Sequence, residues 1–102
     1  MNIKDFTNGW VVGDFLPSII KTQDIGVGVL YLKAGEKGDG HYHMEHVEYN
    51  IILQGSAEKD GALLKTGDIF VYECGEKSFV EYKEDTILLV LKSPSVKNDK
   101  YF

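Results

Sequence analysis

The order of apolar and polar residues along the chain indicates short strands. The clearest stretch is 25–31, in which Ile25, Val27, Val29 and Tyr31 occupy every second position. Successive side chains of a strand point to opposite faces, so a period of two is typical of a strand with one face in the core. This pattern therefore predicts a strand over 25–31.

Further short runs rich in apolar, β-branched and aromatic residues are separated by glycine or charged residues. We expect strands at 10–15, 47–54, 62–64, 69–73, 78–82 and 86–91. Lys59-Asp60-Gly61 is expected to form a hairpin turn before 62–64, because glycine tolerates a positive φ. None of these runs has the length of a typical helix. Short strands joined by glycine-rich turns predict an all-β sandwich or barrel.

Length and charge limit the organisation and the partners. The chain has 102 residues, 43% of them apolar, with no internal repeat and no linker-like stretch. Domains are commonly about 100 to 150 residues long, so we expect a single domain over 1–102. The formal net charge of -5 opposes binding to phosphate backbones and anionic membrane surfaces. Neither nucleic acid nor a membrane is therefore an expected partner.

Cysteine usage and the longest apolar run bear on the location of the protein. Cys74 is the only cysteine, so no disulfide can form within the chain. The longest unbroken apolar run, 87–91, is far shorter than the ~20 residues of a membrane-spanning helix. The first ten residues lack the pattern of a signal peptide. We expect a cytoplasmic protein.

All three histidines lie within six positions, at His41, His43 and His46. Residues two apart on a strand share a face, so His41 and His43 can converge on one metal ion. A carboxylate is then needed as a third ligand. An unbroken strand would place Glu45 on the same face, whereas Glu48 requires a turn within 44–47. Spacing alone leaves both carboxylates open.

The region 35–55 resembles the first motif of the cupins. That motif has a glycine, five residues, His-x-His, three or four residues, a glutamate, six residues and a second glycine, and this chain fills its fixed positions with Gly35, His41, His43, Glu48 and Gly55. The resemblance implies a cupin double-stranded β-helix, a jelly-roll-like barrel. It also implies that Glu48, rather than Glu45, is the carboxylate ligand.

The second cupin motif is degenerate over 67–82. Gly67 and Gly75 keep their places, but Glu73, Ser78 and Tyr82 stand where the cupins have proline, a fourth histidine ligand and asparagine. The expected site is therefore His41, His43 and Glu48 with water, holding a divalent ion such as Fe, Mn, Ni or Zn. His46 is a further candidate for the fourth ligand if its turn folds inward.

The residues that follow Glu48 predict a pocket. If Glu48 faces inward, strand alternation places Asn50 and Ile52 on the same face and Tyr49, Ile51 and Leu53 on the outer one. Ser78 and Tyr82 share a face in the same way, so we expect Asn50, Ser78 and Tyr82 to line a substrate pocket. Tyr82 and Asn50 are the candidates for a catalytic role.

These residues predict a small cupin with a metal site, acting on or binding a small polar metabolite. The alternatives are a metal-free cupin of the sugar-binding, sugar-nucleotide-binding or isomerase type, and a ligand-binding module without turnover, so enzyme status stays open. The resemblance implies a homodimer, for which Trp10, Phe15 and the outward residues of 47–54 offer apolar surface. The tail, 93–102, is expected to be a solvated strap.

Overall fold

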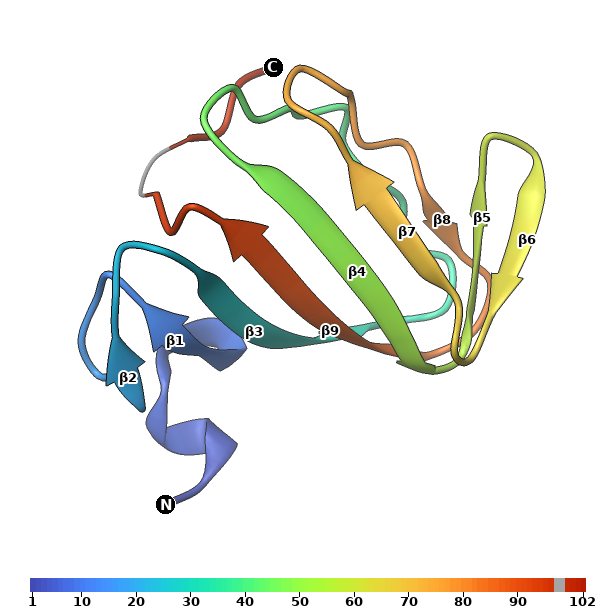
Figure 1. The fold of residues 1–102 in the computed structure, drawn as a ribbon. Coiled ribbons are helices and arrows are strands. Elements are labelled where there is room, and N and C mark those ends of the chain that lie inside the picture. Colours follow the sequence, from blue (N-terminus) through green and yellow to red (C-terminus); the bar gives the residue numbers. More distant parts are fainter. Residues whose placement is uncertain (97–98) are drawn as a thin grey trace.

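The computed structural model describes residues 1–96 and 99–102, and these residues form nine strands and two short 3₁₀ helices (Figure 1). The helices are η1 (Ile3–Asp5) and η2 (Thr7–Gly9). The strands are β1 (Trp10–Gly13), β2 (Ile20–Lys21), β3 (Gly26–Leu32), β4 (Val47–Gln54), β5 (Ser56–Lys59), β6 (Ala62–Lys65), β7 (Ile69–Tyr72), β8 (Glu81–Tyr82) and β9 (Thr86–Ser93). The expected all-β class is confirmed.

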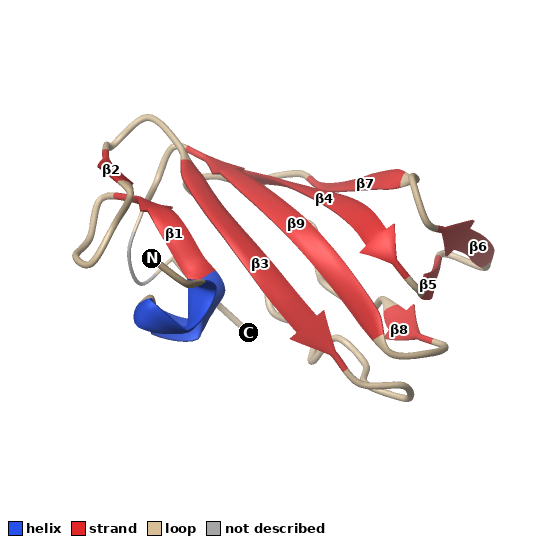
Figure 2. Ribbon diagram, turned by 90° about the horizontal axis from the view of Figure 1, so that it is seen from below, coloured by secondary structure: helices blue, strands red, loops and turns tan. Residues whose placement is uncertain are grey.

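The strands form two sheets. The larger sheet has the order β2-β1-β3-β9-β4-β7 and the smaller one β6-β5-β8. In the larger sheet β9 lies between β3 and β4 and pairs antiparallel with both, and Figure 2 shows β3, β9, β4 and β7 side by side. The small sheet lies beyond the β7 end of the large one (Figures 1 and 2).

The core lies on one face of the larger sheet, which we call the inner face. Along β4, Asn50 and Ile52 are buried, whereas Tyr49 and Leu53 are 42% and 47% exposed. This alternation confirms the two faces expected for 47–54. The buried apolar residues come from both sheets and from the segment before β8, and they are Ile52, Ala57, Phe70, Tyr72, Val80, Tyr82, Leu88 and Val90.

The hairpin turn is where the sequence predicts it, but its first strand is different. Asp60 and Gly61 have φ values of 52° and 79°, the left-handed conformation of a tight hairpin. The strand that enters the turn is β5, which was not expected, because the chain changes direction at Gly55 with a φ of 108°. A Cβ at Gly55 would lie 2.4 Å from Thr86 Oγ1, so only glycine fits. This break releases β4 to pair with β7 and β9.

The strand expected at 78–82 is shorter in the structure, where β8 covers only Glu81–Tyr82. The preceding segment instead pairs with the loop before the histidines, and Gly40 N–H donates to the Ser78 carbonyl at 2.9 Å. Gly38 permits this close approach, since a Cβ there would lie 2.3 Å from the same carbonyl oxygen. Among the described residues, no helix is long and apolar enough to cross a membrane.

Candidate functional site

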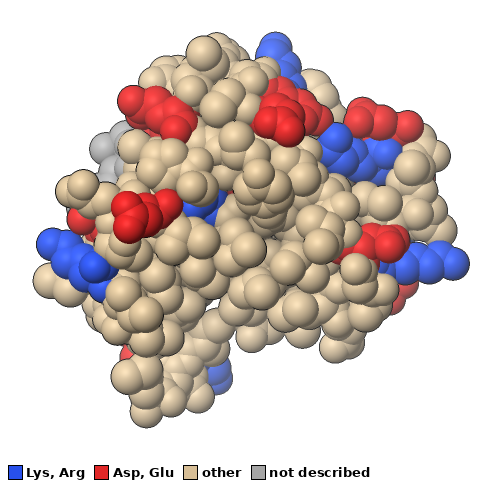
Figure 3. Space-filling model, viewed as in Figure 1, with Lys and Arg blue, Asp and Glu red and all other residues tan. Residues whose placement is uncertain are grey.

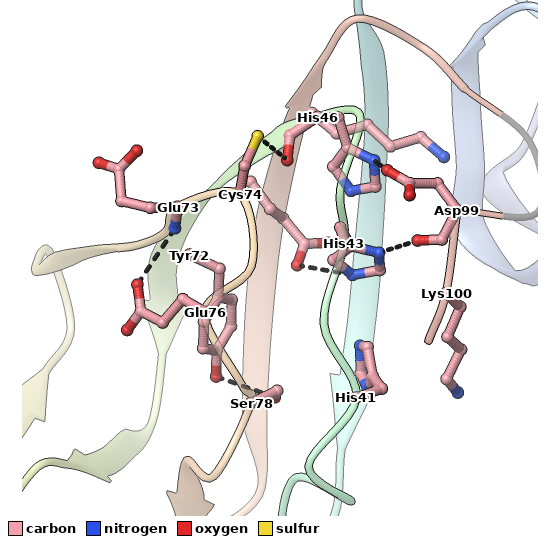
Figure 4. Close-up of polar contacts among 12 residues, drawn as sticks. His41, His43, His46, Tyr72, Glu73, Cys74, Glu76, Ser78, Asp99 and Lys100 are labelled. Carbon is pink, nitrogen blue, oxygen red and sulfur yellow. Dashed lines mark hydrogen bonds and ion pairs between the residues drawn. The ribbon is translucent and has the colours of Figure 1, made fainter. Parts of the chain in front are cut away.

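The histidine segment, 41–46, lies between two other parts of the chain and is fixed by backbone hydrogen bonds on both sides. On one side, the N–H groups of Ser78 and Gly75 donate to the carbonyls of His41 and His43 at 2.9 and 2.6 Å. On the other side, Tyr42 and Tyr101 exchange two hydrogen bonds of 2.9 Å. Figure 4 shows His41, His43 and His46 one above another along this segment.

The rings of His41 and His43 lie together, with centroids 4.9 Å apart. In each ring Nδ1 faces an oxygen: Asp39 Oδ1 lies 2.5 Å from His41 Nδ1, and the backbone carbonyl of Asp99 contacts His43 Nδ1. The hydrogen bond from His41 lowers the pKa of Asp39 to about 2, so this carboxylate is ionised. Because neither oxygen carries a proton, Nδ1 is the donor in both rings, and in the neutral form of each imidazole the lone pair is then on Nε2.

Glu48 lies beside these rings at the start of β4. Its Oε2 atom is 3.9 Å from His43 Nε2, and both side chains are 15% exposed. Burial raises the pKa of the Glu48 carboxyl, while the nearby His43 and His41 oppose that shift. A bend at Met44 and Glu45 interrupts the strand and leaves Glu45 exposed. Glu48, and not Glu45, is therefore the carboxylate next to His43.

His46 points inward, which was the condition for counting it as a candidate fourth ligand. The residue is 4% exposed, and its ring centroid lies 4.2 Å from that of His43. Its Nδ1 atom is 2.9 Å from Asp99 Oδ2, but among the described residues neither ring nitrogen has a well-aligned hydrogen-bond partner. Burial and the neighbouring His43 lower the pKa of His46 to about 4, against the effect of Asp99, so the ring is neutral at pH 7.

Two groups of metal-ligating side chains therefore share His43. Ligand atoms of His43, His46 and Asp99 lie within 4.8 Å of one another. The ligand atoms of His41, His43 and Glu48 are not all this close to one another. The Asp99 carboxylate, however, already accepts the N–H groups of Met44 and Glu45 at 2.9 and 2.8 Å. Burial alone would raise the pKa of Asp99, but these two bonds and the nearby His46 and His43 together lower it.

A cavity of about 240 Å³ adjoins the histidines. Apolar side chains of β3 and β9 form part of its wall. Its polar lining includes His41, Glu48, Asn50, Ser78 and Tyr82, which were expected in a pocket, together with Tyr72, but His43, which was expected there too, is not among the lining residues. Ser78 Oγ donates to the Tyr72 hydroxyl at 3.1 Å. Burial raises the pKa of Tyr82, so its hydroxyl stays protonated at neutral pH. The Asn50 side-chain N–H₂ is buried and has no partner among the described residues.

The sequence did not reveal Asp39, Tyr72 or Asp99 as parts of this region. Asp39 is two residues before His41, and Tyr72 follows the alternation of β7 opposite Glu48, so a signal for both existed. Asp99 lies more than fifty residues from His43, and nothing in the spacing links the two. The expectation of a solvated tail is met in part: Ser93, Pro94 and residues 100–102 are exposed, whereas Ser95 and Asp99 are buried.

Comparison with solved structures places this fold among known proteins. The structure of KdgF from a Halomonas species has a TM-score of 0.67 and 25% identity, with 76% of each chain covered. A Klebsiella pneumoniae protein with a double-stranded β-helix domain has a TM-score of 0.66 and 20% identity over 93% of this chain and 84% of that one. The DMSP lyase DddQ from Ruegeria pomeroyi has a TM-score of 0.73 and 21% identity, covering 96% of this chain but only 53% of the lyase.

These neighbours are cupin-domain proteins, and the chain is by its fold a member of the cupin superfamily. Neither a scan of protein-family models nor a search of curated proteins gives a match. The cupin resemblance of this chain and the all-β fold that it implies are confirmed.

Proposed function

We propose that this chain is a small cupin that binds a divalent metal ion through His41, His43 and Glu48 and holds a small polar metabolite in the adjoining cavity. One observation carries the proposal: in both imidazoles Nδ1 faces an acceptor oxygen, so in the neutral ring Nε2 is the nitrogen available to a metal, and Glu48 Oε2 lies 3.9 Å from that of His43. Histidine ligands of metals are held in this way in most metal sites.

The side chains fit such an ion. Two imidazoles and one carboxylate suit Fe, Mn, Ni and Zn. The 3.9 Å between His43 Nε2 and Glu48 Oε2 is less than twice a usual metal–ligand distance of about 2.1 Å, so both atoms can reach one ion. His41 lines the same cavity as Glu48, and its ring centroid lies 4.9 Å from that of His43, so a rotation of the His41 ring would let it join the same ion. Water completes the coordination.

The cavity supports a ligand with oxygen acceptors. A bound metal ion would supply Lewis-acid polarisation of a ligand oxygen. The Asn50 side-chain N–H₂, which has no partner among the described residues, and the protonated Tyr82 hydroxyl both offer a hydrogen-bond donor to such a ligand. At about 240 Å³ the cavity is smaller than the ~300 to 1,000 Å³ of most ligand sites, so the ligand is small. Tyr82 and Asn50 remain the candidates for a catalytic role.

A metal-free pocket is the second candidate function. Asn50, Tyr72, Ser78 and Tyr82 form a polar wall that does not depend on the histidines. Such a wall suits hydroxyl-rich ligands, as in a sugar-binding or sugar-nucleotide-binding cupin, with or without isomerase activity.

The experiment is titration of the purified protein with Co(II), followed by visible absorption, which reports on the ligands of the ion. We expect one Co(II) per chain, with affinity at least about 100-fold lower in His41→Ala and Glu48→Gln because each loses a ligand. Glu45→Gln is the matched control, since that exposed carboxylate was the alternative left open by spacing, and its affinity should equal wild type.

The same titration separates the two groups that share His43. Binding that survives His41→Ala and Glu48→Gln but is lost in His46→Ala would assign the ion to His43, His46 and Asp99 and contradict the proposal. No binding by wild-type protein would favour the metal-free pocket.

We also propose that a second copy of this chain is a partner, and that it packs on the outward side of β3, β9, β4 and β7. We call this side the apolar outer face; its residues are Val27, Val29, Tyr31, Tyr49, Ile51, Leu53, Ile69, Val71, Ile87, Leu89 and Leu91. The strand register joins them into rows across four strands, such as Val29, Leu89, Ile51 and Ile69. Figure 3 shows Lys, Asp and Glu side chains spread over the face of the molecule seen in Figure 1, whereas every residue of the apolar outer face is uncharged. An uncharged face lets two chains of net charge -5 associate without close like charges.

A further inference from the structure

The C-terminal residues 99–102 lie along the histidine segment and cover its free side. Tyr101 and Tyr42 exchange both backbone hydrogen bonds at 2.9 Å, as neighbouring strands do, and their rings stack with centroids 5.6 Å apart. Without this pairing, the N–H and carbonyl of Tyr42 would form an open edge. The tail therefore acts as an added strand for the segment that carries the histidines.

Asp99 is the residue of this tail that binds the bend at Met44 and Glu45. Its side chain is fully buried, and its two carboxylate oxygens accept the N–H groups of Met44 and Glu45 at 2.9 and 2.8 Å. These two N–H groups belong to the bend that separates His43 from Glu48. The carboxylate therefore fixes the bend that brings Glu48 beside His43.

The main chain of Asp99 acts on His43 itself. Its carbonyl oxygen accepts a hydrogen bond from His43 Nδ1–H, so the residue that fixes the bend also orients the His43 ring (Figure 4). The next residue reaches the other imidazole indirectly, because Lys100 Nζ lies 3.5 Å from Asp39 Oδ2 and Asp39 holds His41 Nδ1. The tail therefore holds His43 directly, and it contacts the aspartate that holds His41.

We propose that Asp99 is a positioning residue of the metal site: its carboxylate docks the tail on the Met44–Glu45 bend, and its carbonyl holds His43 with the proton on Nδ1 and Nε2 directed toward Glu48. This inference rests on the proposed function for its effect on metal binding. Its effect on the tautomer of His43 does not require a metal. Outer hydrogen-bond partners of metal-binding histidines typically change affinity about 10- to 100-fold.

The test compares Asp99→Ala with Asp68→Ala. Asp68 is a matched control, because its carboxylate also accepts a backbone N–H, that of Lys65 at 2.8 Å, in the turn before β7. The first measurement is ¹⁵N NMR of the metal-free protein at pH 8, where the ring nitrogen shifts report the tautomer. We expect wild type and Asp68→Ala to show His43 protonated on Nδ1, and Asp99→Ala to show a mixture of both tautomers.

The second measurement is Co(II) affinity, in which Asp99→Ala should be weaker by about 10-fold or more and Asp68→Ala within 2-fold of wild type. A lower melting temperature with unchanged tautomer and affinity would show a merely structural role and overturn the proposal. If wild type binds no Co(II), the proposed function fails, and the tautomer measurement alone decides the role of Asp99.

Two further variants keep the test decisive if Asp99→Ala does not fold. Asp99→Asn keeps the shape of the side chain and one acceptor oxygen, so it should fall between wild type and Asp99→Ala in both measurements. Tyr101→Pro removes the N–H that binds the Tyr42 carbonyl while leaving Asp99 in place, and it should shift the His43 tautomer in the same direction. A wild-type tautomer in both folded variants would overturn the proposal.

Discussion

The two faces of β4 differ in a way that ordinary patterning does not suggest. The inner face carries Glu48 and Asn50 at one end and Ile52 at the other, whereas Tyr49 and Ile51 lie on the outer face. Strands that cover a core usually turn their polar residues outward. Here Glu48 and Asn50 line the cavity instead, so the inner face of this strand is divided between a polar cavity wall and the core.

The comparison shows that alternation defines two faces but does not say which of them is inside. Hydrophobicity alone would turn Tyr49, Ile51 and Leu53 inward. The histidines and Glu48 set the orientation instead, since imidazoles and a carboxylate converge only from the inner face. The apolar outer face is then left uncovered, and a second chain is the natural way to bury it.

The largest expected effect separates the inner core from the outer face of the same strand. Ile52 is fully buried, so Ile52→Ala should lower the free energy of unfolding by about 2 to 5 kcal/mol. Leu53→Ala, at a residue that is 47% exposed, should cost less than about 1 kcal/mol in the monomer. Urea unfolding at low protein concentration measures both. Equal losses would mean that the two faces are packed alike.

The next effect concerns the apolar outer face alone. Ile69 is 59% exposed there, so Ile69→Lys should weaken self-association at least about 10-fold, which is about 1.4 kcal/mol, without unfolding the chain. Leu63→Lys is the control, since Leu63 is 55% exposed but lies on β6 of the other sheet. Sedimentation equilibrium reports the association. A wild-type chain that stays monomeric at high concentration would refute the second-copy proposal.

The smallest effect tests the inner polar end. Because the buried Asn50 side-chain N–H₂ has no partner in the part of the chain that the structure describes, Asn50→Leu should leave the free energy of unfolding unchanged or raise it by about 1 kcal/mol. Asn50→Asp keeps the shape but adds a carboxylate near Glu48, so it should destabilise the protein. Urea unfolding of both variants is the measurement. A loss above about 2 kcal/mol in Asn50→Leu would show that the amide has a structural partner.

Much of the fold follows from local pattern. The runs at 25–31, 47–54 and 86–91 became β3, β4 and β9, the three long central strands. The alternation in 25–31 and the apolar, β-branched and aromatic content of the other two runs are local properties that need no knowledge of partners. The convergence of His41 and His43 and the inward direction of Asn50 follow from the same rule.

The rest depends on contacts between distant residues. The strand β5 is short and polar, and it exists because Gly55 turns the chain away from β4. Asp99 reaches the bend at Met44 only through the three-dimensional path of the tail, which no spacing rule contains. The tail has the composition of a solvated segment, yet its backbone hydrogen bonds to the histidine segment outweigh that tendency.

The β5–β6 hairpin offers a place for insertion. It extends at the far end of the molecule from β1 and β2 (Figure 1), and its tip consists of Asp60 and Gly61. Neither residue lines the cavity of the histidines or belongs to the apolar outer face. Exposed turn tips tolerate added sequence, so a fluorescent tag placed between Asp60 and Gly61 would allow copies of the chain to be counted one molecule at a time.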